Sequence, residues 1–324
     1  MGRNCMDWTS KDLRAKFRVR NRVHDLSVKR PVRVITYAAE DAPQEIICGT
    51  RETVDRTMIP PHQHEYYELT LCLEDGGIHE TQTGRTPIKR GAVIAMAPGE
   101  VHGFRPAGTG RGSTVVCNYL AEWLYPDVRE LLDELEFISL FLHKTLFGEI
   151  RRVEVPQWHV DEEVLEACLR EFQDIGLECE RQEPSHSFLR LCLKKAMVRL
   201  FRAYKCSAPI EPFVAEEPLL RSALLHIEDC ILQCTPFRVS ALAEELRLGA
   251  DSFSKFFKEA TGSNPMDYYQ HRRLQQACSL LLGTSRSLTE IAHALGYCDS
   301  AHFSHLFKRY YGTTPSGYRR NFGR

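Results

Sequence analysis

The sequence lacks the features of a secreted, membrane-spanning or zinc-finger protein. Its twelve cysteines include no C-x-x-C pair, and the two nearest are Cys230 and Cys234. This spacing argues against a disulfide framework and against a structural zinc site, so we expect a reducing compartment. No apolar run approaches the roughly 20 residues of a membrane-spanning helix, and the charged N-terminus has no signal-peptide core. We therefore expect a cytoplasmic protein without a membrane partner.

The chain also has almost no net charge, but its charge is unevenly distributed. The formal net charge of the 324 residues is −1. Residues 217–324 contain 13 Lys and Arg against 10 Asp and Glu, a net charge of +3. A mildly basic C-terminal part fits contact with phosphates, although this excess is weak evidence on its own. The length allows two or three domains.

Two similar blocks lie 50 residues apart near the C-terminus. The first is FSKFFK at 253–258 and the second is FSHLFK at 303–308. Each follows a short helical pattern, 243–246 before the first block and 292–295 before the second. A helix–turn–helix motif that recurs at one spacing predicts two DNA-binding elements on one body.

Each predicted motif has a second helix with one buried and one outward face. Ser240 and Ser287 are candidate N-caps of the first helices, and Gly249 and Gly296 are candidate turn residues. The second helix of the first motif is expected at about 250–261, with Gly262 ending it and Pro265 beginning the next helix. A helix over 267–282 could hold the two second helices about 34 Å apart, one turn of DNA. The side chains expected to face inward are Phe253, Phe256, Phe257, Phe303, Leu306 and Phe307.

The C-terminal part resembles the DNA-binding domain of AraC/XylS-family transcription regulators. The resemblance covers about residues 236–320 and is carried by RLQQA at 273–277, LTEIAHALGY at 288–297, and the run from Phe303 to Arg319. It implies base-reading positions in the second helices, with phosphate contacts at their ends and at the pair 319–320. The implied DNA-binding residues are Asp251, Ser254, Lys255, Lys258, Ser300, Ala301, Ser304, His305, Lys308 and Arg309. Neither outward face has a central arginine, the residue most used to contact guanine, so shape readout is expected to contribute.

Residues 31–125 are predicted to form an antiparallel β-barrel or sandwich. Short alternating runs occur at 32–37, 68–73, 78–83, 93–96 and 114–117, separated by Gly, Pro and Asp. In an extended strand, residues 62, 64, 66 and 68 lie on one face, which aligns His62, His64, Tyr66 and Glu68. His102 follows from a later strand.

This histidine-rich pattern resembles the metal-binding motifs of cupin barrels, which implies a cupin-like fold. Three interpretations remain open. The effector-binding interpretation assigns an organic ligand to His62, His64, Tyr66, Glu68 and His102. The metal interpretation assigns a divalent ion to His62, His64, Glu68 and His102, because imidazole and carboxylate suit Zn, Fe, Mn or Ni. The third interpretation is a structural polar cluster. Nearby aromatic residues, among them Tyr119 and Trp123, suit a sugar but could equally belong to the core.

The remaining segments complete a multidomain organisation. We expect an N-terminal arm at 1–30, the cupin-like barrel at 31–125, a helical packing or dimerisation segment at 126–206, a linker at 207–218, and an all-α double helix–turn–helix domain at 219–324. Within the helical segment, Val128, Leu131, Leu135, Ile138 and Leu142 follow the spacing of a coiled-coil seam.

The favoured hypothesis is a ligand-responsive, sequence-specific transcription regulator that is not an enzyme. Its expected partners are a double-stranded DNA operator, a sugar-like or other small polar effector, a second copy of the chain and RNA polymerase. One alternative is a metal-dependent cupin enzyme fused to a DNA-binding module. Another is a constitutive DNA-binding regulator whose barrel is a scaffold.

Overall fold

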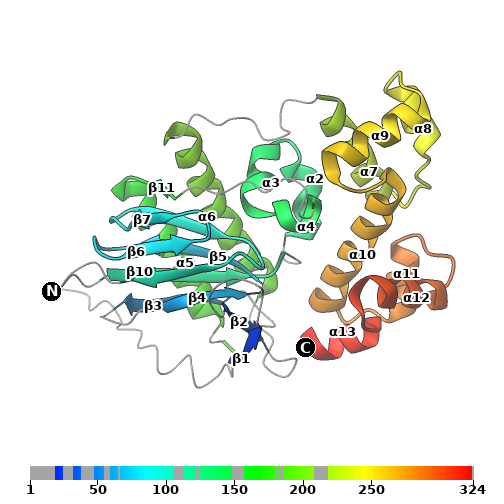
Figure 1. Ribbon diagram of the computed structural model, residues 1–324. Helices are drawn as coiled ribbons and strands as arrows, with labels where there is room; N and C mark the ends of the chain where they lie inside the picture. The colour runs from blue at the N-terminus through cyan, green and yellow to red at the C-terminus, as the bar shows by residue number, and fades with distance from the viewer. Residues whose placement is uncertain are drawn as a thin grey trace. The chain divides into compact units, whose positions relative to one another are not determined.

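A computed structural model of the chain contains a β unit and a helical unit (Figure 1). It describes residues 19–24, 32–37, 47–54, 59–64, 66–105, 112–121, 124–147, 157–179, 181–182, 185–207 and 218–322. The β unit comprises residues 1–120 and 155–209, and the helical unit comprises residues 121–154 and 210–324. Most of the expected arm at 1–30 and the expected linker at 207–218 lie outside the described residues.

The first sheet of the β unit has six strands in the order β1-β2-β4-β9-β6-β7. Only the pairing of β2 with β4 is parallel among these neighbours. Residues 19–24, expected to be irregular, form the first strand and pair with the second. The bounds are β1 Val19–His24, β2 Val32–Tyr37, β4 Ile59–His64, β6 Ile78–Thr81, β7 Arg85–Pro87 and β9 His102–Arg105.

The second sheet has five antiparallel strands in the order β11-β8-β5-β10-β3. Every residue of β5 and β8 is buried, so these inner strands are covered on both faces. The strands predicted around 32–37, 68–73, 78–83, 93–96 and 114–117 are confirmed. The bounds are β3 Ile47–Val54, β5 Tyr67–Cys72, β8 Ala92–Met96, β10 Gly112–Tyr119 and β11 Trp158–His159.

One glycine of this sheet is required by its surroundings. Gly91 has φ of +78°, and a Cβ at this position would lie 2.6 Å from the carbonyl oxygen of Val160. The same glycine accepts a hydrogen bond from the Val160 amide at 2.9 Å. The close approach that joins β11 to the edge of β8 is therefore possible only without a side chain.

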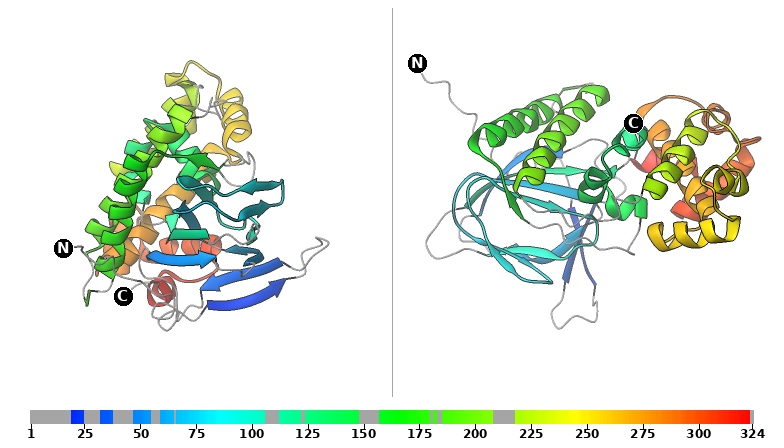
Figure 2. Two further views of the ribbon diagram at one scale, coloured as in Figure 1. Left: turned by 90° about the vertical axis from the view of Figure 1, so that its left-hand side faces the viewer. Right: turned by 90° about the horizontal axis from the view of Figure 1, so that it is seen from above.

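Two long helices complete the β unit, α5 (Glu162–Cys179) and α6 (His186–Ser207). They pack against each other, with α5 contacting β3 and α6 contacting β11, and Figure 2 shows them side by side. Their inward residues, such as Leu165, Phe172 and Leu193, are fully buried. Trp158 of β11 donates its indole N–H to the carbonyl oxygen of Leu200 at 3.2 Å, which ties the sheet edge to α6.

The helical unit is arranged around α10 (Pro265–Gly283), which contacts α7, α9, α11 and α13. Pro265 begins this helix and Gly262, with φ of 81°, ends the preceding one, as the sequence predicts. The other bounds are η2 Tyr125–Asp127, α2 Val128–Leu131, α3 Leu135–Phe141, α4 His143–Phe147, α7 Pro218–Leu232, α8 Val239–Glu245, α9 Ala250–Thr261, α11 Leu288–Ala294, α12 Ser300–Tyr311 and α13 Pro315–Phe322.

The expected coiled-coil seam does not lie along one helix. Its five residues are divided among α2, α3 and the end of α3, with breaks at 132–134 and at Leu142. All five side chains are buried, with at most 9% exposure at Leu131. The apolar spacing therefore reflects packing inside the helical unit, because a seam between copies would have to be exposed in the single chain.

In the second helix–turn–helix motif the N-cap and the turn residue are those expected from the sequence, whereas in the first motif both differ. Ser287 caps α11 in a capping box with Glu290, and Gly296 has φ of 74°. In the first motif the N-cap of α8 is Arg238, without a side-chain hydrogen bond, so Ser240 lies inside the helix. The left-handed turn residue is Arg247, with φ of 59°, whereas Gly249 has φ of −70°.

The helices and the cysteines can be compared with the expectations about membrane spans and disulfides. No described helix is both long and apolar enough to cross a membrane. Among the described cysteines, five are free and buried, three are free and exposed, and Cys117 is disulfide-bonded. The sequence did not predict this disulfide bond.

Candidate functional site

A cluster of histidines lies where the two sheets of the β unit meet. The chain leaves the six-stranded sheet at His64, the last residue of β4, and enters the five-stranded sheet at Tyr67. The four residues of the expected single strand, 62, 64, 66 and 68, are therefore divided by a corner. His102 on β9 is the register partner of His62 on β4. The expected residues still come together, but the pairing of β4 with β9 and the corner bring them there.

The cluster is compact and closed to solvent. His64 and His102 are each 1% exposed. The Nε2 atom of His64 lies 3.5 Å from Oε2 of Glu68, and the Nε2 atom of His102 lies 3.7 Å from Oε1 of the same carboxylate. The ring centroids of His62 and His102 are 4.3 Å apart. The side chains of three strands in two sheets thus converge on one carboxylate.

The tautomer of His64 follows from its backbone partner. Its Nδ1 lies 2.7 Å from the carbonyl oxygen of Tyr66, which can only accept, so Nδ1 must donate. Burial, followed by the proximity of His62, lowers the pKa of His64 to about 3, so the ring is neutral near pH 7. The Nε2 of His64 therefore presents a lone pair to the Glu68 carboxylate. Two acceptors face each other there, a repulsive arrangement unless a proton or a cation lies between them.

The donor set fits a divalent metal ion. One ligand atom each from His64, Glu68 and His102 can be chosen so that all three lie within 4.8 Å of one another. Among the described residues, neither Nε2 of His64 nor Nε2 of His102 has a hydrogen-bond partner. A histidine whose other ring nitrogen donates to a backbone carbonyl is the usual arrangement of a metal ligand. Two imidazoles and a carboxylate are the ligands of a site for zinc or a similar ion that keeps a position open.

Three aromatic residues were expected near the cluster, and one histidine near it was not predicted from the sequence. The Tyr66 ring stacks on His64 with centroids 4.1 Å apart, whereas Tyr119 stacks on Tyr67 at 5.3 Å. Trp123 lies outside the described residues. His79 of β6 is 6% exposed, and its ring centroid is 6.0 Å from that of His102. The isolated histidine in a predicted strand was the available signal, but only the pairing of β6 with β9 brings it to the cluster.

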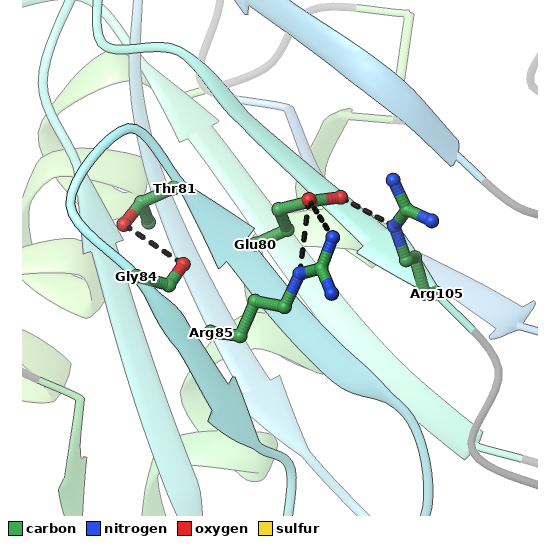
Figure 3. A network of polar contacts seen from close by, with 5 residues as sticks. All are labelled: Glu80, Thr81, Gly84, Arg85 and Arg105. Carbon is green, nitrogen blue, oxygen red and sulfur yellow. Dashed lines mark hydrogen bonds and ion pairs between the residues drawn. The ribbon is translucent and has the colours of Figure 1, made fainter.

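An ion-pair network holds the strand that carries His102. Glu80 on β6 accepts hydrogen bonds from Arg85 on β7 and from Arg105 on β9 (Figure 3). The guanidinium Nη2 of Arg85 lies 2.9 Å from Oε1 of Glu80. These hydrogen bonds, together with the charges of the two arginines, lower the pKa of Glu80, although burial acts in the opposite direction. The network connects three neighbouring strands on the side of β9 opposite β4.

The second candidate site is formed by the outward faces of α9 and α12, the recognition helices. Residues 251–259 and 301–309 have the same sequence of exposed, intermediate and buried positions. Phe253, Phe257, Phe303 and Phe307 are fully buried, whereas the other two expected anchors, Phe256 and Leu306, are only partly buried. Asp251, Lys255, Lys258, Ala301, His305, Lys308 and Arg309 are exposed, and Ser254, Ser300 and Ser304 are intermediate.

Two outward residues of the expected DNA-binding surface were not predicted, and one predicted cation does not face outward. Ser252 and His302 are exposed at equivalent positions, three residues before Lys255 and His305. Both residues could have been predicted from the sequence, because they lie 50 positions apart and each is one helical turn before a predicted outward residue. Arg319 donates from Nε to the carbonyl oxygen of Leu281 at 3.1 Å, so it is held against the protein. The hydroxyl of Ser304 donates to the carbonyl oxygen of Ser300 at 2.7 Å.

Adjacent arginines of α10 bind two different parts of the helical unit, α7 and the second motif. Arg272 is 1% exposed and pairs with Glu228 of α7, with Nε 2.7 Å from Oε1 and Nη2 3.0 Å from Oε2. Arg273 donates from Nη2 to the carbonyl oxygen of Leu295 at 2.6 Å, and its guanidinium carbon lies 3.9 Å from the Tyr297 ring centroid. One arginine thus binds the first helix of the C-terminal part, and the next binds the turn of the second motif.

Two family models match the chain, one within the helical unit and one that covers most of the β unit and also residues 121–154 of the helical unit. Residues 242–321 match a helix-turn-helix domain, and residues 46–193 match an AraC-like ligand binding domain. The first match contains both recognition helices, and the second contains the histidine cluster.

Similar proteins include transcriptional activators from two bacteria. The activator RhaR of Pectobacterium atrosepticum is 25% identical over 274 residues, which cover 82% of this chain and 87% of that protein. The activator RhaS of Escherichia fergusonii is 23% identical over 277 residues, covering 86% of this chain and 93% of that protein. Among solved structures, the C-terminal domain of the response regulator yesN from Fusobacterium nucleatum is 35% identical. It covers 30% of this chain and 93% of that chain, with a TM-score of 0.28.

Proposed function

Because the chain belongs to the AraC family of transcription regulators, we propose that it binds an operator with α9 and α12 and that an effector in the β unit regulates this binding. The observation that carries the proposal is the identical exposure pattern of the two recognition helices on either side of α10. Two such helices on one scaffold can enter successive major grooves. The relatives described above are activators, which supports activation of transcription as the outcome.

The two recognition helices should contact different bases. Their buried faces share phenylalanines, but the outward positions hold Lys255 against His305 and Asp251 against Ala301. Aspartate at 251 of α9 can accept from cytosine, whereas alanine at 301 of α12 can make only an apolar contact, for example with a thymine methyl, so the side-chain chemistry of the two helices is unlike. Each half-site is therefore expected to contain two different sub-sites.

Lys255→Ala is expected to weaken specific operator binding by roughly 5- to 150-fold, because a base contact contributes about 1–3 kcal/mol of discrimination. Binding to a scrambled duplex should change much less. The measurement is fluorescence anisotropy with a duplex selected by the full chain from a random-sequence library.

Lys258→Ala provides the matched control on the same helix. Lys258 is exposed near the end of α9, where a phosphate contact is expected. Its loss should weaken binding to both duplexes by a similar factor and lower the salt dependence by about one counterion. Equal losses on both duplexes for Lys255→Ala as well would remove Lys255 from the base-reading residues.

For the effector, we propose a sugar-like or other small polar molecule bound at the histidine cluster. Imidazole and carboxylate groups can bind hydroxyls, and the Tyr66 ring supplies an aromatic face. To regulate transcription, the effector must bind two states of the protein with different affinity. A thermal-shift screen against sugars, sugar acids and divalent metals tests this assignment, because a ligand of the native state raises its melting temperature.

A divalent cation at the same cluster is a second candidate, favoured by the lone pair that His64 directs at Glu68. The residues that would hold it are His64, Glu68 and His102, with His62 beside them. When bound, the ion would supply a Lewis-acid position for an oxygen of the effector. The protein positions the ligands: the carbonyl oxygen of Tyr66 fixes the orientation of the His64 ring, and the pairing of β4 with β9 fixes the position of His102.

His102→Ala is expected to abolish metal binding by protein purified without a histidine tag, because it removes one of three ligands. Metal content after loading with zinc or cobalt and gel filtration is the measurement, together with the visible absorption of the cobalt form. His79→Ala is the matched control, since it deletes a buried histidine of the same cluster outside the trio and should retain one equivalent. A wild-type protein that binds no metal would leave the organic effector as the sole occupant.

We further propose that the regulator acts in the cytoplasm as a homodimer that pairs through α5 and α6 and contacts RNA polymerase. Three large apolar side chains support the pairing surface: Leu177 of α5 is 42% exposed, and Phe188 and Leu191 of α6 are 40% and 56% exposed. The charges are complementary as well, because α6 carries six Lys and Arg without an acidic residue, whereas α5 carries six Asp and Glu with one arginine. The α5 helix of one copy would therefore suit the α6 helix of another.

A further inference from the structure

Residues 124–147, the docked segment, belong to the helical unit although the chain around them belongs to the β unit. They follow β10 and precede β11, yet they group with the C-terminal helices. Their apolar side chains are buried, among them Tyr125, Val128, Leu132, Ile138 and Phe141. The docked segment is thus a folded part of the DNA-binding body rather than a loop of the barrel.

The docked segment forms hydrogen bonds with α10, the helix between the two motifs. Gln276 donates from Nε2 to the carbonyl oxygen of Tyr125 at 2.8 Å, and Gln275 donates from Nε2 to that of Thr145 at 3.0 Å. The guanidinium carbon of Arg272 lies 5.5 Å from the Tyr125 ring centroid. Gln275 also accepts from Arg272 at 2.6 Å. The buried arginine that binds α7 is therefore in direct contact with the docked segment.

The docked segment also contacts α7. Arg129 of α2 donates from Nε to Oδ1 of Asp229 at 2.7 Å, and this hydrogen bond is the main reason that the pKa of Arg129 is raised. Arg221 of α7 donates from Nε to the carbonyl oxygen of Leu132 at 3.2 Å and from Nη2 to Asp133 at 2.6 Å. Contacts on both α7 and α10 hold these two helices together. The α7 helix in turn contacts α8 of the first motif, where Nδ1 of His226 lies 3.0 Å from Oε2 of Glu245.

The docked segment is also the covalent neighbour of the candidate effector site. Asn118 of β10 is the register partner of Glu68 on β5, and Tyr119 of β10 is the partner of Tyr67. Tyr125 follows Tyr119 by six positions, and its ring and carbonyl oxygen contact α10. Along the chain, only residues 120–124 separate β10 from η2.

We infer that the docked segment is a positioning element that holds α7 and α10 in the arrangement that fits the operator. The inference rests on the proposed function and deepens it, because it names the part of the protein through which the state of the β unit reaches the recognition helices. Docking favours specific binding, since both recognition helices must meet the DNA at once. Nonspecific binding depends mainly on phosphate contacts and does not need this precision.

A charge swap between Arg129 and Asp229 tests the inference in the full chain. Arg129→Glu and Asp229→Arg each replace an attraction with a repulsion, so each should weaken binding to the library-selected duplex by roughly two- to fivefold. The double variant should recover most of the affinity. The same exchange at Arg90 and Glu162, an exposed ion pair of the β unit, is the matched control and should leave affinity unchanged.

The two single variants separate docking from simple charge effects on DNA. Arg129→Glu makes the protein more negative and Asp229→Arg makes it more positive, so charge alone would shift affinity in opposite directions. Weaker specific binding in both singles with recovery in the double supports the inference. Opposite shifts, tighter binding in both singles or unchanged affinity would overturn it and leave the proposed function standing. A wild-type chain that does not distinguish the selected duplex from a scrambled one would overturn both.

Discussion

Replacing Glu228 with glutamine is expected to lower the free energy of unfolding of the helical unit by about 3–5 kcal/mol, the usual cost of removing one partner of a buried ion pair. Glu228 and Arg272 are each 1% exposed and are joined by two hydrogen bonds. Glutamine keeps the shape of the side chain but leaves the guanidinium charge buried without a compensating carboxylate. Urea unfolding followed by circular dichroism measures the loss, and hydrogen exchange in α7 and α10 locates it.

Asp229→Asn is the matched control for this prediction. It makes the same chemical change at the next residue of α7, where the side chain is 44% exposed and its partner Arg129 is 34% exposed. An exposed ion pair contributes up to about 1 kcal/mol, so the control should destabilise the unit far less. Similar losses in the two variants would mean that the buried pair is not what holds α7 to α10.

Phe307→Ala is the second large effect, with an expected loss of about 3–5 kcal/mol. Phe307 is fully buried in the second motif, with ring centroids 4.7 Å from Tyr311 and 5.4 Å from Tyr318. Because this core positions α12, its loss should unfold the second motif before the first. A footprint on the library-selected duplex should then lose protection at one end only.

Two further variants serve as comparisons for Phe307→Ala. Phe257→Ala, the equivalent buried position of the first motif, should remove protection at the opposite end of the footprint. Leu306→Ala deletes a partly buried neighbour and should retain a full-length footprint with a smaller loss of stability. A complete footprint with wild-type affinity for Phe307→Ala would contradict the requirement for an ordered second motif.

The bounds of the first recognition helix and most of the outward positions of both recognition helices were predictable from the sequence. The predicted bounds of about 250–261 match α9, and Gly262 and Pro265 end and restart the helices as expected. Helical periodicity explains this success, because residues three and four apart share a face whatever the rest of the chain does. The turn of the first motif was less predictable, since Arg247 rather than a glycine adopts the left-handed conformation.

The sequence predicted that His62, His64, Glu68 and His102 lie close together, which the structure confirms, but it did so for the wrong geometric reason. Alternation along one strand cannot cross the corner between β4 and β5, and it cannot include His79. The register of β4 with β9 and of β6 with β9 brings the rings together. Register between strands depends on side chains packed across two sheets, which no local pattern specifies.

The sequence by itself determined that this chain has a β region with a histidine-rich motif and a C-terminal pair of helix–turn–helix motifs with unlike outward faces. Those features are encoded locally, in periods of two and of three to four residues and in one 50-residue offset. Only the tertiary structure decided where the apolar residues of 128–142 are buried. Their docking depends on contacts such as that between Gln276 and Tyr125, 151 positions apart, and the same apolar spacing would suit a seam between copies equally well.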